Sequence, residues 1–121
     1  KRVLRELALL FPDLYATLLD MVDRTVDLLP VTKSYWYHRD QRGSWSIKAV
    51  LPTMTDLDYK SMDVKDGKGA KEAYLEAINL EPTDSRRLFL ATALKAYCAQ
   101  DTWAMVAMAR FLSKKATSLD Y

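Results

Sequence analysis

Apolar residues recur at helical spacing in the first part of the chain. A helix is predicted before Pro12, because apolar positions repeat every three or four residues while Arg2, Arg5 and Glu6 lie on the other side. The repeat consists of Val3, Leu4, Leu7, Leu10 and Phe11. A second helix is predicted over roughly Asp13–Arg24. Its expected buried stripe consists of Leu14, Leu18, Met21, Val22 and Thr25.

The middle of the chain alternates between short elements and loops. Residues 25–29 begin with β-branched side chains, precede Pro30 and are too few for a stable helix, so they predict a short strand or extended segment. A polar loop follows over residues 39–43. Ser44 is suited to N-cap a helix that ends at Pro52.

The last part of the chain predicts an irregular stretch and two more helices. Residues 53–68 show no period, and Asp66-Gly67 is a turn signal. A helix over about Gly69–Leu80 is expected to turn Ala73, Tyr74, Ala77 and Ile78 inward. Residues 83–85 then offer an N-cap for the longest helix, which is expected to reach about Leu112. The prediction is a mainly α fold with five or so helices and at most one or two short strands.

Composition narrows the class of protein only a little. The 121 residues are 50% hydrophobic and 28% charged, as in ordinary globular proteins, and the net charge of +2 is too weak to indicate nucleic-acid binding by itself. Cys98 is the only cysteine, so an internal disulfide is impossible and a reducing, cytoplasmic location is predicted. No stretch has the length of a membrane span, so no membrane partner is expected.

One carboxylate stands out in the last predicted helix. Asp101 falls in the middle of a narrow apolar face, where a charge is costly unless it is paired, protonated or bound to a metal. That face consists of Leu90, Leu94, Tyr97, Cys98, Met105, Met108 and Leu112. A divalent ion would explain the carboxylate, and Tyr97, one turn earlier, could orient a metal-activated water. Alternatively, Asp101 caps a helix that begins at Thr102, or pairs with Arg87 or another basic group.

The same residues resemble a known family. Tyr97-Cys98-Ala99-Gln100-Asp101 looks like the third motif, Tyr-x-x-x-Asp, of the tyrosine-type DEDD exonucleases, a branch of the ribonuclease-H-like superfamily. Three segments in order resemble a bacterial family of uncharacterised domains that is found at the C-terminus of predicted RecB-like nucleases. These segments are GSWSIKAVLP at residues 43–52, DG at residues 66–67 and YCAQDTWAMV at residues 97–106.

The resemblance implies that residues 1–121 are the helical C-terminal part of one ribonuclease-H-like α/β exonuclease domain, without its first strands and first two acidic motifs. Mg²⁺ or Mn²⁺ would serve 3′–5′ hydrolysis of nucleic acid in the intact protein, with Asp101 as a metal ligand and Tyr97 as the water-positioning residue. By the same resemblance, Asp27 would occupy a structural or site-edge position. A RecB-like nuclease domain would be a partner in cis. Because one carboxylate cannot hold two metals, the fragment alone is expected to be inactive and to bind no metal tightly. A non-catalytic helical scaffold or protein-interaction module is the alternative.

Two further expectations concern binding surfaces. Bases and aromatics alternate between Lys33 and Lys48, as single-stranded nucleic-acid binding requires. The candidate contact residues are Tyr35, Trp36, Arg39, Arg42 and Lys48. The alternative is that the aromatics fill the core and the bases form a solvated rim. His38 and Cys98 are interpreted as a hydrogen-bonded structural residue and a small core residue. Because the apolar C-terminal helix lacks strand partners, a homodimer is also predicted.

Overall fold

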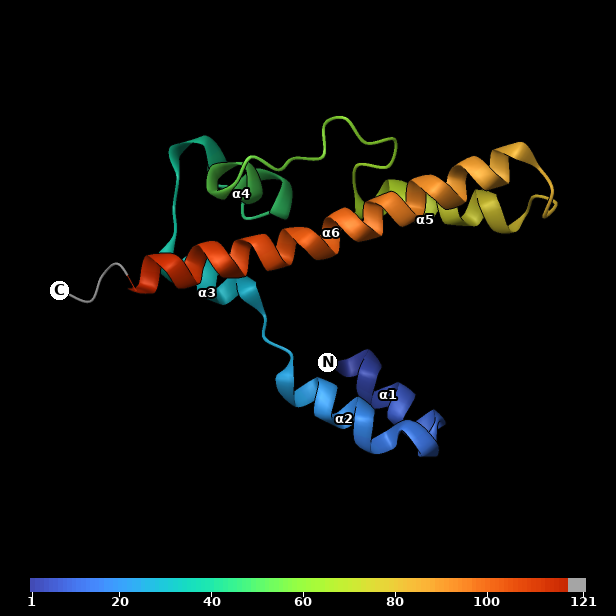
Figure 1. Cartoon of the computed structure of the whole chain (residues 1–121), viewed down its shortest axis with the longest axis horizontal. Coiled ribbons are helices and arrows are strands. Elements are labelled where there is room, and N and C mark those ends of the chain that lie inside the picture. Colours follow the sequence, from blue (N-terminus) through green and yellow to red (C-terminus); the bar gives the residue numbers. More distant parts are fainter. Residues whose placement is uncertain (118–121) are drawn as a thin grey trace. The chain divides into compact units, whose positions relative to one another are not determined.

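The structure is a computed structural model that describes residues 1–117, with side chains described to residue 115 (Figure 1). These residues confirm the mainly helical fold and contain no strand. Its α-helices are α1 (Arg2–Leu10), α2 (Tyr15–Arg24), α3 (Leu28–Tyr35), α4 (Ile47–Met54), α5 (Gly67–Ile78) and α6 (Ser85–Thr117), and short 3-10 helices cover Pro12–Leu14 and Arg39–Gln41. The chain divides into two compact units, Lys1–Val31 and Thr32–Tyr121.

The first unit is a helical hairpin in which α1 packs against α2. Ala8 and Val22 are its buried residues, at 1% and 3% exposure. The prediction of a buried stripe is correct for Val22 but wrong for Leu14 and Met21, which are about half exposed, and for Thr25, which is exposed. Two short helices cover only one narrow stripe on each other, so Leu4, Leu7 and Leu18 are partly buried. Leu9 and Leu10 stay at the surface, at 76% and 71% exposure.

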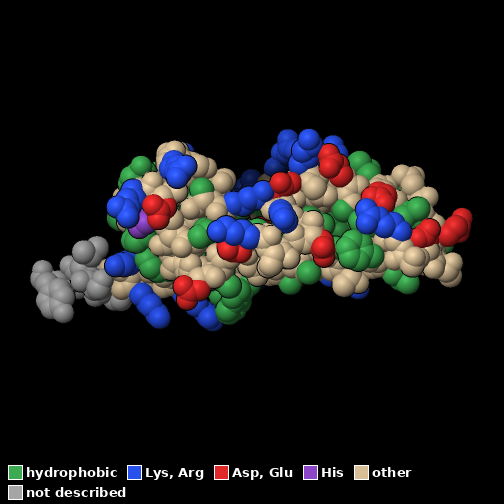
Figure 2. Space-filling view, turned by 90° about the horizontal axis from the view of Figure 1, so that it is seen from above, with side chains coloured by type: hydrophobic (Ala, Val, Ile, Leu, Met, Phe, Trp, Pro, Cys, Tyr) green, Lys and Arg blue, Asp and Glu red, His purple; other side chains and the backbone are tan. Residues whose placement is uncertain are grey.

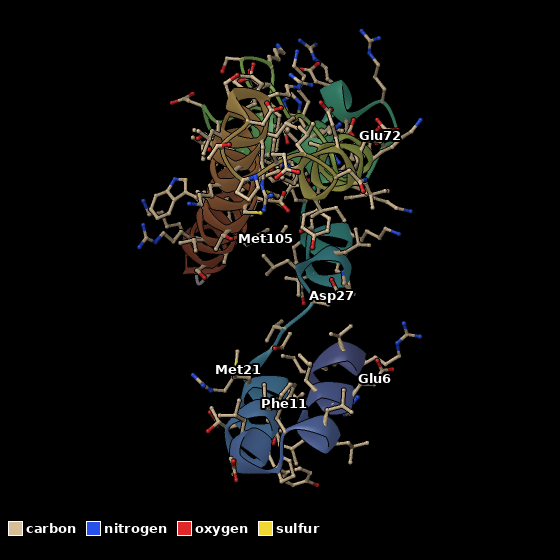
Figure 3. The ribbon with its side chains drawn as sticks, turned by 90° about the vertical axis from the view of Figure 1, so that its right-hand side faces the viewer. Glu6, Phe11, Met21, Asp27, Glu72 and Met105 are labelled. Carbon is tan, nitrogen blue, oxygen red and sulfur yellow. The ribbon has the colours of Figure 1, made fainter. Side chains whose placement is uncertain are left out.

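No strand forms at residues 25–29, and the alternative prediction of an extended segment is correct only before α3 begins. Thr25 ends α2 in an extended conformation, and α3 begins three residues later at Leu28. Asp27 lies at the start of α3 (Figure 3), where its Oδ1 accepts the backbone N–H of Leu29 at 2.9 Å. Pro30 fits the first turn because no helical hydrogen bond needs an N–H there. The side chain of Asp27 therefore starts a helix that the β-branched residues do not predict.

The second unit is built along α6, with α5 and α4 packed against it (Figure 1). Its core cluster contains Val64, Ala73, Ala77, Leu90 and Ala93. The prediction that α5 turns Tyr74 and Ile78 inward is wrong, since they are 57% and 51% exposed. The small side chains of Ala73 and Ala77 form the contact stripe and let the two helices approach closely, so the larger neighbours point outward.

The starts of these helices show how local side chains set their bounds. Asp66, expected in a turn, is the N-cap of α5, and its Oδ1 accepts the N–H of Gly69 at 2.7 Å. Helix α4 begins after Ser46 rather than Ser44 and continues past Pro52. Helix α6 begins as predicted, because Asp84 Oδ1 accepts the N–H of Arg86 at 2.7 Å.

Helix α6 is a single 33-residue helix that extends beyond the predicted end at Leu112. Leu90, Ala104 and Met108 are buried on its packed face. The prediction that Cys98 and Met105 belong to this face is wrong, because both are exposed. At 3.6 residues per turn they fall to one side of the covered stripe. Over the part of the chain that the structure describes, no helix is apolar for long enough to cross a bilayer.

Candidate functional site around Asp101

Asp101 lies in the interior of α6 and is partly buried on its packed side. The irregular segment after α4 crosses this point and places Tyr59 against the helix. The Tyr59 hydroxyl donates to Asp101 Oδ1 at 2.9 Å, across 42 residues of sequence, and the Tyr59 side chain is buried at 5% exposure. Beside it, Gln100 Nε2 donates to the backbone oxygen of Asp58 at 3.1 Å. Two neighbouring residues of α6 therefore hold the same segment.

Both simple alternatives for Asp101 are wrong. No helix begins at Thr102, because α6 runs without interruption from Ser85 to Thr117. Arg87 does not pair with Asp101, since its Nη1 donates to the backbone oxygen of Leu80 at 2.8 Å. Within residues 1–115, Asp101 has no ion pair with any basic side chain. A neutral phenol is thus its hydrogen-bonding partner, and its negative charge is not balanced by a neighbouring cation.

The two tyrosines beside Asp101 respond to its charge. Burial raises the pKa of Tyr59 well above 10, and the hydrogen bond to Asp101 raises it further because an ionised phenol would face a carboxylate. Burial, followed by the charge of Asp101, also raises the pKa of Tyr97. The rings of Tyr59 and Tyr97 lie 6.2 Å apart between centroids. Tyr97 is therefore near Asp101, as predicted, but Tyr59 makes the hydrogen bond.

The residues present do not build a two-metal centre on their own. Among the described residues, no group of three or more His, Cys, Asp or Glu side chains could hold a metal ion. Asp101 offers one carboxylate, whereas a two-metal site needs several. Asp27, placed by resemblance at a structural or site-edge position, uses its Oδ1 at the start of α3. A two-metal centre at Asp101 would need further carboxylates from outside the described residues.

The candidate nucleic-acid residues divide into two groups. Lys48 Nζ pairs with Asp66 Oδ2 at 3.0 Å, at the start of α5. Trp36 is partly buried: its Nε1 donates to Thr53 Oγ1 at 3.1 Å, and its ring packs edge-on against Phe111 with centroids 4.8 Å apart. Trp36 and Lys48 therefore have structural contacts.

The other three candidate residues are exposed. Tyr35 is 77% exposed, and the Arg39 side chain is 92% exposed. Arg42 is also exposed and has the left-handed conformation, with φ of 48°, that ends the 3-10 helix Arg39–Gln41. Arg39 Nε lies 3.6 Å from Asp40 Oδ1, but both side chains of this ion pair are exposed to solvent. Tyr35, Arg39 and Arg42 can therefore contact a ligand.

His38 is a hydrogen-bonded structural residue, as predicted. The His38 Nδ1 accepts the backbone N–H of Asp40 at 3.3 Å, and the backbone N–H of His38 donates to Gln41 Oε1 at 2.7 Å. Gln41 is buried at 2% exposure, which anchors this capping box in the second unit. These hydrogen bonds link the two ends of the 3-10 helix in the predicted polar loop, and Arg39 and Arg42 lie exposed on it.

A groove of about 590 Å³ lies between residues 63–66, α5 and α6. Its floor includes Leu90 and Ala93, and its rim carries acidic groups, including Glu72 on α5 (Figure 3). Three ion pairs already involve rim residues: Arg86 Nε meets Glu76 Oε1 at 2.7 Å, Lys48 Nζ meets Asp66 Oδ2 at 3.0 Å, and Lys68 Nζ meets Glu72 Oε1 at 3.9 Å. The sequence carried no signal for this groove, because it forms only when α5 packs on α6.

Comparison with known proteins gives one family match. A family model described as a domain of unknown function (DUF2779) matches residues 1–46. The first 46 of the 121 residues are therefore similar to an uncharacterised domain, whereas Tyr97 and Asp101 lie outside the matched range. The match carries no information on a RecB-like nuclease context. Searches among curated proteins and among solved structures gave no match.

Proposed function

We propose that this chain is the helical C-terminal part of a metal-dependent 3′–5′ exonuclease-like domain and is inactive by itself. Its contribution would be Asp101 as one ligand for Mg²⁺ or Mn²⁺ and Tyr97 beside it, with nucleic acid as the substrate of the intact protein. A RecB-like nuclease domain would lie in the same polypeptide, and the protein would act in the cytoplasm.

The observation that supports this proposal is the electrostatic state of Asp101. It is a partly buried carboxylate whose Oδ1 is held by Tyr59, while no basic side chain among residues 1–115 balances its charge. Burying an unpaired charge is unfavourable, and a divalent cation would relieve that cost. The Tyr59 hydroxyl would then hold the carboxylate in a fixed orientation, as groups around a metal ligand commonly do.

A degradation assay on the full-length protein tests the proposal. A 3′-labelled single strand is incubated with Mg²⁺ or Mn²⁺ and with the wild type, Asp101→Asn or Asp58→Asn. Asp58 is a matched control, because it lies in the segment that packs on Asp101 but contacts Gln100 through its backbone oxygen. Metal-dependent loss of the 3′ end should disappear in Asp101→Asn and persist in Asp58→Asn. Equal degradation by all three proteins would reject the assignment.

The second candidate is a non-catalytic scaffold or protein-interaction module attached to a nuclease. The apolar side chains that the structure leaves exposed favour it. On the outward side of α6, Leu88, Trp103 and Val106 are 59%, 48% and 36% exposed. These residues are spaced for one helix face, and the occupant that we propose for this face is a second copy of the chain.

The oligomeric state tests this second candidate. Light scattering should give the mass of a homodimer, and Leu88→Lys should convert it to a monomer while the helical content stays unchanged. Lys is a suitable replacement because the site is open and a charge there disfavours burial against a partner. A wild-type monomer at high concentration that binds no hydrophobic dye would contradict the homodimer.

A further inference from the structure

The second unit carries a surface on which aromatic rings and cations lie together. Lys33 Nζ lies 6.0 Å from the centre of the Trp45 ring, and Tyr37 lies 6.2 Å from Trp45 between centroids. At Trp36, the neighbour of Tyr37 in sequence, Lys115 Nζ lies 5.9 Å from the rings of both Trp36 and Phe111. These six residues, Lys33, Trp36, Tyr37, Trp45, Phe111 and Lys115, are called the aromatic–cation patch below.

The fold, rather than the local sequence, assembles this patch. Residues 33–45 supply four of its members, and the C-terminal end of α6 supplies Phe111 and Lys115. The edge-on contact of Trp36 with Phe111 joins the two segments. Lys115, which by sequence marks only a helix end, is therefore brought to the ring of Trp36.

The aromatic side chains of this region are not all used by the core. Trp36 has structural contacts, but Tyr35 and Tyr37 are 77% and 63% exposed. An exposed tyrosine presents a flat face on which a base can stack, at little cost in side-chain freedom. The alternative that these aromatics fill the core therefore fails for Tyr35 and Tyr37.

Positive charge is concentrated at the same place. Besides the patch lysines, Arg39, Arg42 and Lys114 belong to these two segments, and Asp40 is their one acidic residue. Five of the chain's 18 Lys and Arg therefore lie here with one of its 16 Asp and Glu, which leaves 13 basic and 15 acidic residues for the rest. Figure 2 shows Lys and Arg side chains next to the histidine of this loop. The region is locally basic although the chain is nearly neutral.

We propose that the aromatic–cation patch, with Tyr35, Arg39 and Arg42 around it, binds single-stranded nucleic acid. Cations would follow the phosphates while unpaired bases stack on the exposed tyrosines. A single strand fits better than a duplex, because a duplex keeps its base faces hidden. Lys48, which pairs with Asp66, takes no part. Binding here does not depend on a metal at Asp101, so it can fail or succeed independently of the proposed exonuclease role.

Fluorescence anisotropy with the whole 121-residue chain and a labelled 12-nucleotide dT strand tests the inference. The stacking variant is Tyr35→Ser with Tyr37→Ser, and the charge variant is Arg39→Gln with Arg42→Asn, because Asn tolerates the left-handed conformation of position 42. The matched control is Lys60→Gln with Lys71→Gln. It removes the same charge from exposed sites outside the patch.

The wild type should bind the strand, and the stacking variant should bind about tenfold more weakly or worse. In the charge variant, a plot of log affinity against log salt concentration should be less steep by about 1.4, which is roughly 0.7 for each of the two lost phosphate contacts. The control variant, Lys60→Gln with Lys71→Gln, should bind the strand about as tightly as the wild type, because its patch is intact. Absence of binding, equal affinity for duplex, or weakening in the control equal to that in the charge variant would overturn the proposal. Binding to phosphatidylserine vesicles without binding to the strand would also overturn it in favour of a lipid surface.

Discussion

The hydrogen bond between Tyr59 and Asp101 should contribute measurably to the stability of the second unit. Tyr59→Phe removes only the hydroxyl that donates at 2.9 Å and leaves the buried ring in place, so no cavity forms. Hydrogen bonds to charged groups contribute about 1.5–3 kcal/mol. Because Asp101 is only partly buried, we expect a loss of about 2 kcal/mol in the free energy of unfolding. For a unit of this size that corresponds to a fall in Tm of roughly 10 °C.

The chain has a built-in probe for this measurement. Its three tryptophans, Trp36, Trp45 and Trp103, all lie in the unit Thr32–Tyr121. Urea unfolding followed by tryptophan fluorescence therefore reports on the unit that contains Tyr59, whatever the helical hairpin of residues 1–31 does. Tyr35→Phe is the matched control, because Tyr35 is 77% exposed and should change stability by less than about 0.5 kcal/mol.

A double-mutant cycle isolates the pair. Asp101→Ala removes the acceptor and leaves the Tyr59 hydroxyl buried, so it should also destabilise the unit, while the double variant should lose less than the sum of the two. The expected coupling free energy is about 1–2 kcal/mol. A Tyr59→Phe variant as stable as the wild type within about 0.5 kcal/mol, or additive effects of the two substitutions, would show that this hydrogen bond does not stabilise the unit.

Three further predictions concern pH and single side chains. Because the pKa values of Tyr59 and Tyr97 are raised, the folded state keeps protons that the unfolded state loses at high pH. The free energy of unfolding should therefore fall as pH rises above about 10, and it should fall less steeply in Tyr59→Phe. Urea midpoints measured across that pH range test this. Thr32 is 1% exposed and its Oγ1 has no hydrogen-bond partner among the described residues, so Thr32→Val should raise the free energy of unfolding by about 1 kcal/mol. Thr53→Val, which loses the hydrogen bond from Trp36, should lower the free energy of unfolding. The α5 backbone N–H groups and Lys48 lower the pKa of Asp66, so Asp66→Ala should lower Tm at pH 7, and the difference from wild type should shrink as pH falls below about 4.

Helix positions follow from the sequence because their signals are local. Periodic apolar residues predict α1, α2, α5 and α6, and the side chain of Asp84 marks the start of α6. The errors occurred where a local signal competed with a helix cap. Residues 25–29 have β-branched side chains, yet the Asp27 carboxylate starts α3. The Asp66-Gly67 turn signal marks the N-cap of α5, because the same side chain serves either purpose.

Which side of a helix is covered depends on its neighbours, so the sequence predicts it less well. Cys98 and Met105 belong to an apolar set by spacing, but α5 and α4 cover a stripe that passes beside them. The hydrogen-bonding partner of Asp101 could not be predicted from the sequence at all. Tyr59 lies in an aperiodic segment 42 residues away, and neither its spacing nor its surroundings links it to α6. The sequence could identify the unusual carboxylate but not the group that holds it.

Binding of Mn²⁺ to the full-length protein, measured by electron paramagnetic resonance as the free ion disappears, tests the role of Asp101 most directly. If Asp101 completes a site with carboxylates from elsewhere in the protein, the wild type should show saturable binding that Asp101→Asn weakens by about tenfold or more, while Asp58→Asn leaves it unchanged. Equal Mn²⁺ affinity in the wild type and Asp101→Asn would contradict a metal role and leave Asp101 as the residue that holds Tyr59 against α6.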